Sequence, residues 1–321
     1  MVSFEENLIT PFQDGSETLL VVSGYASATM AHRHFQGIKQ AEPRRSSEFR
    51  LELLVGMCPE DGIARSTHEG FSGLSTGPYK EQFDCRYVVK GPPVHTKLYI
   101  WMSEEVPYKA FTGSANYSQR AFSPERREML VDCAPKAAKR YFDHIRSDTL
   151  PCTDPLVSDL INIYDGPDIS GWQTDAAGFN GDVSEAPAAE PVQVSLLDRS
   201  GSLPARSGLN WGQRPEQNRE PNQAYIRVPL SIARTDFFPE IGRYFTLLTD
   251  DGEALVCVRA QQGGKAIQTP QDNSILGRYF RKRLGIPSGD PVTAGHLNTY
   301  GRNQIEFFPI DSETYWMDFS N

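Results

Sequence analysis

The chain has 321 residues, with 32 lysines and arginines against 41 aspartates and glutamates, and a formal net charge of −9 at pH 7. This length allows two domains that each bury a hydrophobic core. No apolar run approaches the roughly 20 residues that cross a bilayer, and the first residues do not combine a basic region with an apolar run, so we expect neither membrane association nor export. The five cysteines form no Cys-x-x-Cys pair and no Cys/His cluster at zinc spacing, which predicts a reduced, cytoplasmic protein without a metal site or a cofactor.

The first 150 residues alternate short apolar runs, typical of strands, with runs of helical spacing. Strands mixed with helices over this length predict an α/β domain with a mostly buried central sheet. A Gly- and Ser-rich stretch, residues 70–77, predicts a surface loop. The expected strands are 18–23, 49–56, 87–89, 97–101, 110–112 and 128–131, and the expected helices are 28–40 and 137–145.

Polar groups in this first region are concentrated at the ends of three expected strands. His95 and Lys97 are two residues apart, so both side chains project to one face of a strand. Residues 113–116 follow another strand and predict a tight turn, in which small residues let an anion approach the backbone and Asn116 adds an amide donor. Glu128 begins a third expected strand. An imidazole, an ammonium, an amide and a carboxylate are therefore expected near one another.

These groups suit cleavage of a phosphodiester without a metal. A neutral imidazole at His95 can attack phosphorus, while Lys97 and Asn116 hold the non-bridging oxygens as charge develops. Glu128 can hydrogen-bond the second imidazole nitrogen and fix its tautomer. Taken alone, a His-x-Lys pair on a strand is more often a half-exposed surface pair. The three segments together favour a catalytic role.

The same segments resemble the His-x-Lys, Gly-Ser-x-Asn and trailing Glu motifs of the phospholipase D superfamily, in particular its single-motif nucleases. The family pattern places an Asp five residues after the Lys, where this chain has Met102, and the segment before Gly113 is longer than usual. Phospholipases keep that Asp, whereas the BfiI-type restriction nucleases do not need it, so Met102 favours the nuclease branch. The resemblance implies these catalytic residues: His95, Lys97, Ser114, Asn116 and Glu128.

After residue 150 the composition changes to Pro, Gly, Ala, Ser and Asp. Residues 151–204 carry nine acidic side chains and one basic side chain, so nearly all the excess negative charge lies here. Such a segment buries little surface, although we expect a helix at 156–164. The acidic segment could lie over a basic cleft and compete with DNA, but a solvated linker is the simpler interpretation. The predicted organisation is a first domain at 1–165, a linker at 166–205 and a second domain at 206–321.

From Leu209 onward, short runs of strand type predominate, which predicts a mainly-β domain. This order resembles the B3-type pseudobarrel of plant transcription factors and of the DNA-reading parts of some restriction enzymes, although the Trp-rich hairpin of the plant domains is absent. The residues that carry the resemblance are 225–229, 237–239, 275–280 and 285–292. The expected elements are strands 224–229, 244–249, 254–259 and 304–308, a hairpin turn at 250–252 and a helix at 274–284.

Two arms grip the major groove in the B3-like family, and by position they are residues 210–222 and 261–273. Their Arg, Lys, Asn and Gln side chains suit base edges and phosphates. Ordinary polar loops contain the same residue types, so the assignment of each residue is an expectation. The DNA-binding candidates are Gln213, Arg214, Arg219, Asn222, Lys265, Gln268 and Asn273.

A nuclease domain followed by a DNA-reading domain resembles a restriction endonuclease of the BfiI and NgoFVII kind. The resemblance implies site-specific, type II-like cleavage of double-stranded DNA, without a metal, through a covalent phosphohistidine. One histidine must attack while another protonates the leaving oxygen, and the chain holds a single His-x-Lys, so we expect a homodimer with one shared site. For relatives of the NgoFVII kind, the resemblance adds a separate ATP-dependent, helicase-like subunit as a candidate partner.

Two other functions stay open at this point. A phospholipase or another phosphodiesterase could use the same site, but the missing Asp and the second domain argue against it. A non-catalytic DNA-binding regulator could use the α/β part only to dimerise. The intact set of His95, Lys97, Asn116 and Glu128 argues against that alternative.

Overall fold

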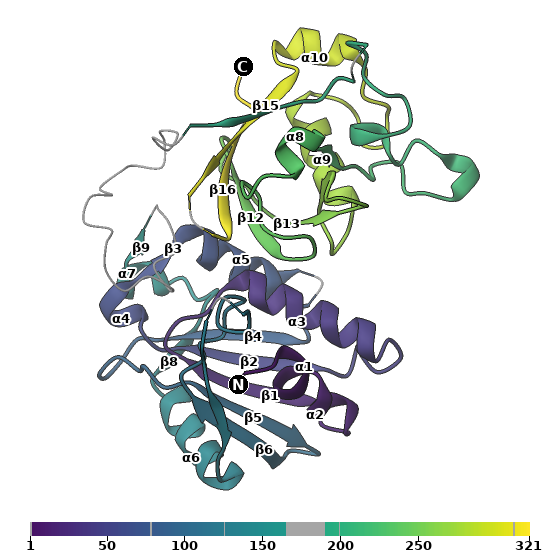
Figure 1. Ribbon diagram of the computed structural model, residues 1–321. Coiled ribbons are helices and arrows are strands. Elements are labelled where there is room, and N and C mark those ends of the chain that lie inside the picture. The colour runs from purple at the N-terminus through teal and green to yellow at the C-terminus, as the bar shows by residue number, and fades with distance from the viewer. Residues whose placement is uncertain (1, 78, 125, 165–189, 199, 311) are drawn as a thin grey trace. The chain divides into compact units, whose positions relative to one another are not determined.

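The computed structural model describes residues 2–77, 79–124, 126–164, 190–198, 200–310 and 312–321, and the chain forms two compact units, 1–180 and 181–321 (Figure 1). Most of the range predicted as a linker, 166–205, lies outside the described residues. Within its last part, Val192–Ser195 forms strand β10 of the second unit's sheet, where Val194 is fully buried. The alternation of Val192 and Val194 with polar residues explains this strand.

The first unit is built on a seven-stranded mixed sheet with the order β7-β6-β5-β1-β2-β4-β8. β1, β2 and β4 run parallel, and β5, β6, β7 and β8 each pair antiparallel with a neighbour. The central strand β1 is apolar and buried from Leu19 to Ser23, as expected for a strand covered on both faces. The strands are β1 (Thr18–Ser23), β2 (Arg50–Val55), β4 (Phe83–Val88), β5 (Leu98–Ser103), β6 (Val106–Gly113), β7 (Leu130–Asp132) and β8 (Thr149–Pro151).

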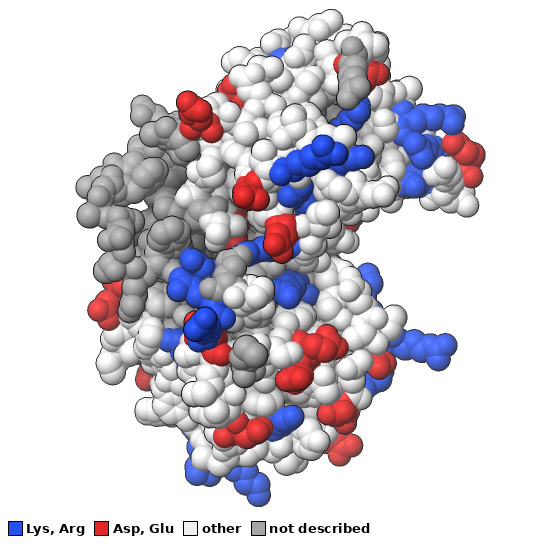
Figure 2. Space-filling model, viewed as in Figure 1, with Lys and Arg blue, Asp and Glu red and all other residues white. Residues whose placement is uncertain are grey.

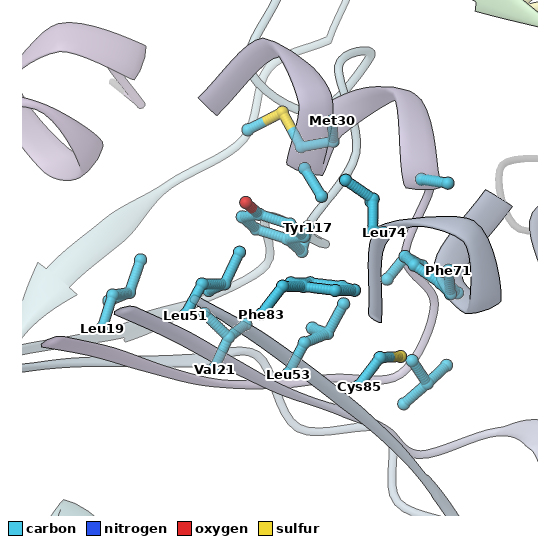
Figure 3. Close-up of a cluster of buried hydrophobic side chains, with 14 of the residues drawn as sticks. Leu19, Val21, Met30, Leu51, Leu53, Phe71, Leu74, Phe83, Cys85 and Tyr117 are labelled. Atoms are coloured by element: carbon cyan, nitrogen blue, oxygen red, sulfur yellow. The ribbon is translucent and has the colours of Figure 1, made fainter. Parts of the chain in front are cut away.

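Helices cover both faces of this sheet, as predicted. On one face, Leu19 and Val21 of β1 pack with Met30, Phe71 and other residues of the helices above them (Figure 3). On the other face, Leu20 and its neighbours pack against α6. The helices are α1 (Phe4–Leu8), α2 (Thr10–Gln13), α3 (Ala28–Ala41), α4 (Cys58–Asp61), α5 (Arg65–Thr76), α6 (Pro135–Arg146) and α7 (Val157–Leu160), and the short strands β3 (Ile63–Ala64) and β9 (Ile163–Tyr164) pair with each other.

Two local predictions for this unit were wrong. The stretch 70–77 is not a loop, because residues 70–76 belong to α5, whose residues Thr67, Phe71 and Leu74 are buried at helical spacing. Gly70 lies where a Cβ would stand 2.6 Å from the Cβ of Ala28, so this glycine allows close helix packing rather than marking a turn. The helix expected at 156–164 is limited to α7, and β9 follows it.

The second unit is a nearly closed, barrel-like sheet with the order β10-β15-β16-β12-β13-β14-β11, in which all neighbours are antiparallel except β12 and β16. The predicted hairpin joins β12 to β13, and the predicted helix is α9, which buries Leu276, Tyr279 and Phe280 in the barrel core. Strands β10, β14 and β16 and helices α8 and α10 were not predicted, and of these β10, β14 and α8 have only three or four residues. The other elements are β11 (Ile226–Arg227), β12 (Tyr244–Thr249), β13 (Ala254–Ala260), β14 (Ala266–Gln268), β15 (Gln304–Pro309), β16 (Thr314–Asp318), η1 (Gly208–Asn210), η2 (Pro215–Gln217), α8 (Leu230–Ala233), α9 (Ser274–Arg283) and α10 (Ala294–Tyr300).

Neither unit contains a helix that could cross a bilayer, as far as the chain is described: none of these helices is both long and apolar enough.

Candidate active site and DNA-binding arms

The candidate catalytic residues lie at one edge of the first unit's sheet. β1, β2 and β6 end at this edge and the antiparallel β5 begins there. His95 and Lys97 were expected on the strand itself, but β5 begins at Leu98, so both lie in the segment that leads into it. A hydrogen bond from the Val94 amide to the Gly56 carbonyl, 2.9 Å, fixes this segment to the end of β2.

The side chains of His95 and Lys97 contact each other. The Lys97 ammonium lies 2.9 Å from Nε2 of His95 and donates to the His95 carbonyl oxygen at 2.7 Å. Burial lowers the pKa of Lys97 to about 8, against the opposing charge of Glu128. Burial and the Lys97 charge lower the pKa of His95, against the charge of Asp61. The imidazole is therefore mainly neutral at neutral pH, and most Lys97 side chains still carry a charge.

The amide of Asn116 is oriented by two groups at the end of β1. Its Oδ1 accepts hydrogen bonds from the Tyr25 backbone N–H and from Ser23 Oγ, both 3.3 Å long. Because a backbone N–H can only donate, this contact assigns the oxygen to the protein side and leaves Nδ2 facing away from it. Among the described residues nothing accepts a hydrogen bond from Nδ2, so it remains a donor for a ligand.

Ser114 joins β6 to the start of β7. Its Oγ accepts from the Met129 amide at 3.1 Å, and its own amide donates to the Met129 carbonyl at 3.0 Å. A Cβ on Gly113 would lie 2.0 Å from that carbonyl, so the glycine is required by the neighbouring backbone rather than by an anion. Ser114 thus fixes the segment that carries Glu128.

Glu128 was expected to hydrogen-bond the imidazole of His95. Its carboxylate acts electrostatically on Lys97 and on the buried Tyr99. In the part of the chain that the structure describes, no hydrogen bond joins Glu128 to His95. Its role beside the imidazole stays a prediction.

Two residues at this site were missed by sequence reasoning, Tyr25 and Asp61. The Tyr25 hydroxyl donates to Asp61 Oδ2 at 2.6 Å, and the Tyr25 ring meets the His95 ring edge to face, with 5.8 Å between the centroids. Neither residue belongs to the three motif segments. The one sequence signal was the turn after β1, where Tyr25 follows a buried strand.

The other histidines of the first unit are engaged away from His95. His34 is fully buried, with Nδ1 on the Tyr117 hydroxyl and Nε2 on the Leu8 carbonyl, and burial lowers the pKa values of both His32 and His34 to about 4. His68 contacts the Tyr87 hydroxyl at 3.1 Å. His144 lies exposed on α6. No second histidine contacts His95 among the described residues.

In the second unit, some arm candidates hold the arm rather than face solvent. Asn222 is 5% exposed, and its Oδ1 accepts from the Gly289 amide at 2.7 Å while its Nδ2 donates to Ser288 Oγ at 3.0 Å. Gln213 donates from Nε2 to the carbonyls of Pro221 and Gly289. Oδ1 of Asn273 is buried and has no partner among the described residues.

The remaining arm candidates keep polar groups available. Arg219 lies over the Trp211 ring, with 4.2 Å from its guanidinium carbon to the ring centroid. Nε of Arg214 donates to the Arg206 carbonyl, Lys265 is exposed, and Gln268 is half-buried. In the view of Figure 1 the first arm projects at the right of the second unit, where Figure 2 shows basic side chains with acidic ones among them.

Two buried arginines fix the arms to the barrel. Arg281, 1% exposed, donates to the Pro221 carbonyl of the first arm and to the Asp290 and Gly277 carbonyls. Arg259, 6% exposed, donates to the Gly264 carbonyl of the second arm and to the carbonyls of Ala233, Phe238 and Pro239. Burial lowers the pKa of both guanidinium groups, which remain charged because their ordinary pKa is so high.

Comparisons with known proteins match both units. Residues 3–159 match the model of the NgoFVII restriction endonuclease N-terminal PLD domain, and residues 186–311 match that of the NgoFVII C-terminal B3-like DNA-binding domain. No curated protein matches the chain. Among solved structures, NucT from Helicobacter pylori is similar at 15% identity and a TM-score of 0.32, covering 46% of this chain and 89% of its own. Polyphosphate kinase from Porphyromonas gingivalis is similar at 15% identity and a TM-score of 0.30, and the match covers 50% of this chain and 23% of the kinase chain.

Both superpositions are loose, so the family rests on the two sequence matches, which between them span most of the chain in the predicted order. They confirm the resemblance drawn from the motifs of the first unit and from the strand pattern of the second. They also favour a nuclease over a phospholipase or a non-catalytic regulator. The chain belongs to the NgoFVII family of restriction endonucleases and is a PLD-type restriction nuclease with a B3-like DNA-binding domain.

Proposed function

We propose that this protein is a type II-like restriction endonuclease that cleaves double-stranded DNA at a specific site, without a metal, through a phosphohistidine at His95. The observation that carries the proposal is the contact between His95 Nε2 and the Lys97 ammonium, with both pKa values lowered. A neutral imidazole is a nucleophile, and a partly buried ammonium stabilises negative charge more strongly than an exposed one.

The contact between Lys97 and Nε2 of His95 in the free protein suggests the order of the cleavage steps. Because Lys97 donates to Nε2 of His95, that nitrogen carries a lone pair and Nδ1 carries the proton. A bound phosphate draws Lys97 to a non-bridging oxygen and frees Nε2 to attack phosphorus. The Nε2–P bond forms, the bond from phosphorus to the leaving oxygen breaks, and that oxygen takes a proton from a second imidazole. Water then attacks phosphorus, gives its proton to that second imidazole, and releases His95.

The second imidazole must come from another subunit, since no other histidine contacts His95 in the described part of this one. An edge strand next to the site supports a dimer there. β7 ends the sheet, and Met129 and Val131, which flank Leu130, are 57% and 45% exposed. Large exposed apolar side chains on a strand edge are typical of contact surfaces. We therefore place two copies of His95 in one shared site of a homodimer.

Cleavage in EDTA tests the proposed activity most simply. Plasmid DNA incubated with the protein and EDTA should be nicked and then linearised, and sequencing of the ends should show one recurring site. Nicking precedes linearisation because one shared site attacks one strand at a time. Random ends would remove the site-specific part of the proposal, and cleavage that required Mg²⁺ would remove the metal-free part.

Mixed dimers test the shared site. Wild-type subunits mixed with His95→Ala subunits give heterodimers with one imidazole, which should be inactive, so activity should fall as the square of the wild-type fraction. His144→Ala subunits are the matched control, because this histidine is exposed on α6, and they should leave activity unchanged. A linear fall with His95→Ala would mean that each subunit owns an independent site.

Two further parts of the proposal concern partners and domain limits. The ATP-dependent, helicase-like subunit stays a prediction, and cleavage by the purified protein alone, without ATP, would show that it is not required. For the domain limits, proteolysis should cut within 166–205 and release a C-terminal fragment that still binds the specific site. A fragment that does not bind DNA would contradict these limits.

A further inference from the structure

Tyr25 contacts the site through three different atoms or groups. Its backbone N–H donates to Oδ1 of Asn116, its ring meets the His95 ring edge to face, and its hydroxyl donates to Asp61 Oδ2 at 2.6 Å. The residue follows the end of β1, where the Ser23 hydroxyl accepts from the Tyr117 amide and holds the turn. One residue therefore links the proposed nucleophile and a carboxylate through its side chain, and the proposed amide donor through its backbone.

On the side where Asp61 meets Tyr25, the space around its carboxylate is too small for a nucleotide. Asp61 ends α4 and is half-buried. It lines a cavity of about 20 Å³ together with Tyr25, Thr67 and Tyr164. That volume holds about one water molecule and excludes a nucleotide. Asp61 is thus placed to act on the site through Tyr25 and through its charge.

We propose that Tyr25 and Asp61 form a positioning pair for His95, in which Tyr25 fixes the imidazole and the Asn116 amide and the Asp61 carboxylate stabilises positive charge on the ring. This inference rests on the proposed function, since positive charge develops on the ring when the imidazole attacks phosphorus or carries a proton. A hydrogen-bonded tyrosine keeps its rotamer, which preorganises the groups that it touches.

The charged residues around His95 determine in which direction each one shifts the pKa of the imidazole. Lys97 lowers the pKa of His95, and Asp61 raises it. Glu128 acts on Lys97, and Glu60, the exposed neighbour of Asp61 on α4, acts on Tyr25. Removing the Asp61 charge must therefore lower the pKa of His95. Removing the Glu60 charge should leave that pKa in place, which makes Glu60→Gln a matched control.

The test is an NMR titration of the full-length protein labelled with ¹³C-histidine, with the His95 signal assigned by its loss in His95→Gln. In Asp61→Asn, the pKa of His95 should fall by about half a pH unit or more, as expected for a charge removed at short range. In Glu60→Gln it should match the wild type. Equal pKa values of His95 in Asp61→Asn and Glu60→Gln would overturn the proposal.

Cleavage kinetics add a second, independent readout. Tyr25→Phe keeps the ring but loses the bond to Asp61, so kcat should fall roughly tenfold to a hundredfold with little change in KM. In Asp61→Asn, the acid limb of the pH profile should move to lower pH. Wild-type kcat in Tyr25→Phe would contradict the positioning role. The titration needs no DNA cleavage, so failure of the proposed activity, seen as a wild type that does not cut, is distinguished from failure of this inference.

Discussion

The catalytic edge and the DNA-binding arms place their cationic groups in opposite environments. Lys97 is 6% exposed, and its pKa is lowered to about 8 by burial, whereas Lys265 and Arg219 of the arms face solvent at least in part. In the second unit two buried cations, Arg281 and Arg259, bind backbone carbonyls and hold the arms. Chemistry on phosphorus requires a desolvated, fixed charge, while DNA recognition requires exposed charges on a fixed support.

Loss of the His95 imidazole should give the largest effect. It should remove the activity of the catalytic edge without affecting DNA binding by the arms. His95→Ala should abolish cleavage, because it removes the group that forms the proposed covalent intermediate, and it should leave specific DNA binding unchanged. Plasmid cleavage and gel-shift measurements on one preparation check both halves. A variant that cuts at the wild-type rate would place the active site elsewhere.

A substitution at Asn116 tests whether its Nδ2 donates a hydrogen bond to the phosphate at the catalytic edge. Asn116→Asp keeps the oxygen that accepts from the Tyr25 amide and replaces the Nδ2 donor with an oxygen. We expect cleavage to slow by roughly 10²–10³, as for loss of one preorganised donor to a developing anion. Single-turnover rates with saturating enzyme measure this step. Little change would show that Nδ2 does not face the phosphate.

Within the arms, Asn222 and Lys265 should differ in role, since Asn222 stabilises the arm and Lys265 is available to bind DNA. Asn222→Ala leaves the Gly289 amide and neighbouring polar groups unpaired, so the free energy of unfolding should fall by about 1–3 kcal/mol. Lys265→Ala should leave stability unchanged and weaken DNA binding with a shallower salt dependence. Denaturant unfolding and salt-dependent binding separate the two. If Asn222→Ala kept wild-type stability and lost discrimination between sites, it would be a base contact.

The smallest expected effects are those on the pH dependence of kcat/KM. Because one His95 of the shared site must be neutral and the other protonated, kcat/KM should pass through a maximum at a pH below the ordinary range of histidine, and it should fall further as Lys97 loses its proton near pH 8. Lys97→Arg should move the alkaline limb upward, since a guanidinium does not titrate there. An unchanged alkaline limb in Lys97→Arg would assign that limb to another group.

The order of the strands made the catalytic edge predictable from the sequence. His95 and Lys97 contact each other although both lie just before β5, and the antiparallel strand ends bring Asn116 and Glu128 to the same edge. Tyr25 and Asp61 could not be found this way, because their contact depends on how the turn after β1 packs on α4.

In the second unit the candidate residues lie in loops, where spacing along the sequence does not predict which side chains face solvent. The motif order indicated the B3-like arms, but whether a side chain such as Asn222 turns inward depends on the packing of residues 287–290 against the arm. Spacing along the sequence does not encode that packing. The prediction of a loop at residues 70–77 was wrong for a related reason, since residues 70–76 are helical and Gly70 allows α5 to pack closely on Ala28.

The central claim is that His95 attacks phosphorus. Enzyme mixed with cognate DNA, quenched within a turnover, digested at alkaline pH and analysed by mass spectrometry should yield the peptide around His95 bearing a phosphoryl-linked nucleotide. The adduct should be acid-labile, as expected for a phosphoramidate, and absent from His95→Ala. Full cleavage with no adduct on His95 at any quench time, or an adduct on another residue, would contradict the account.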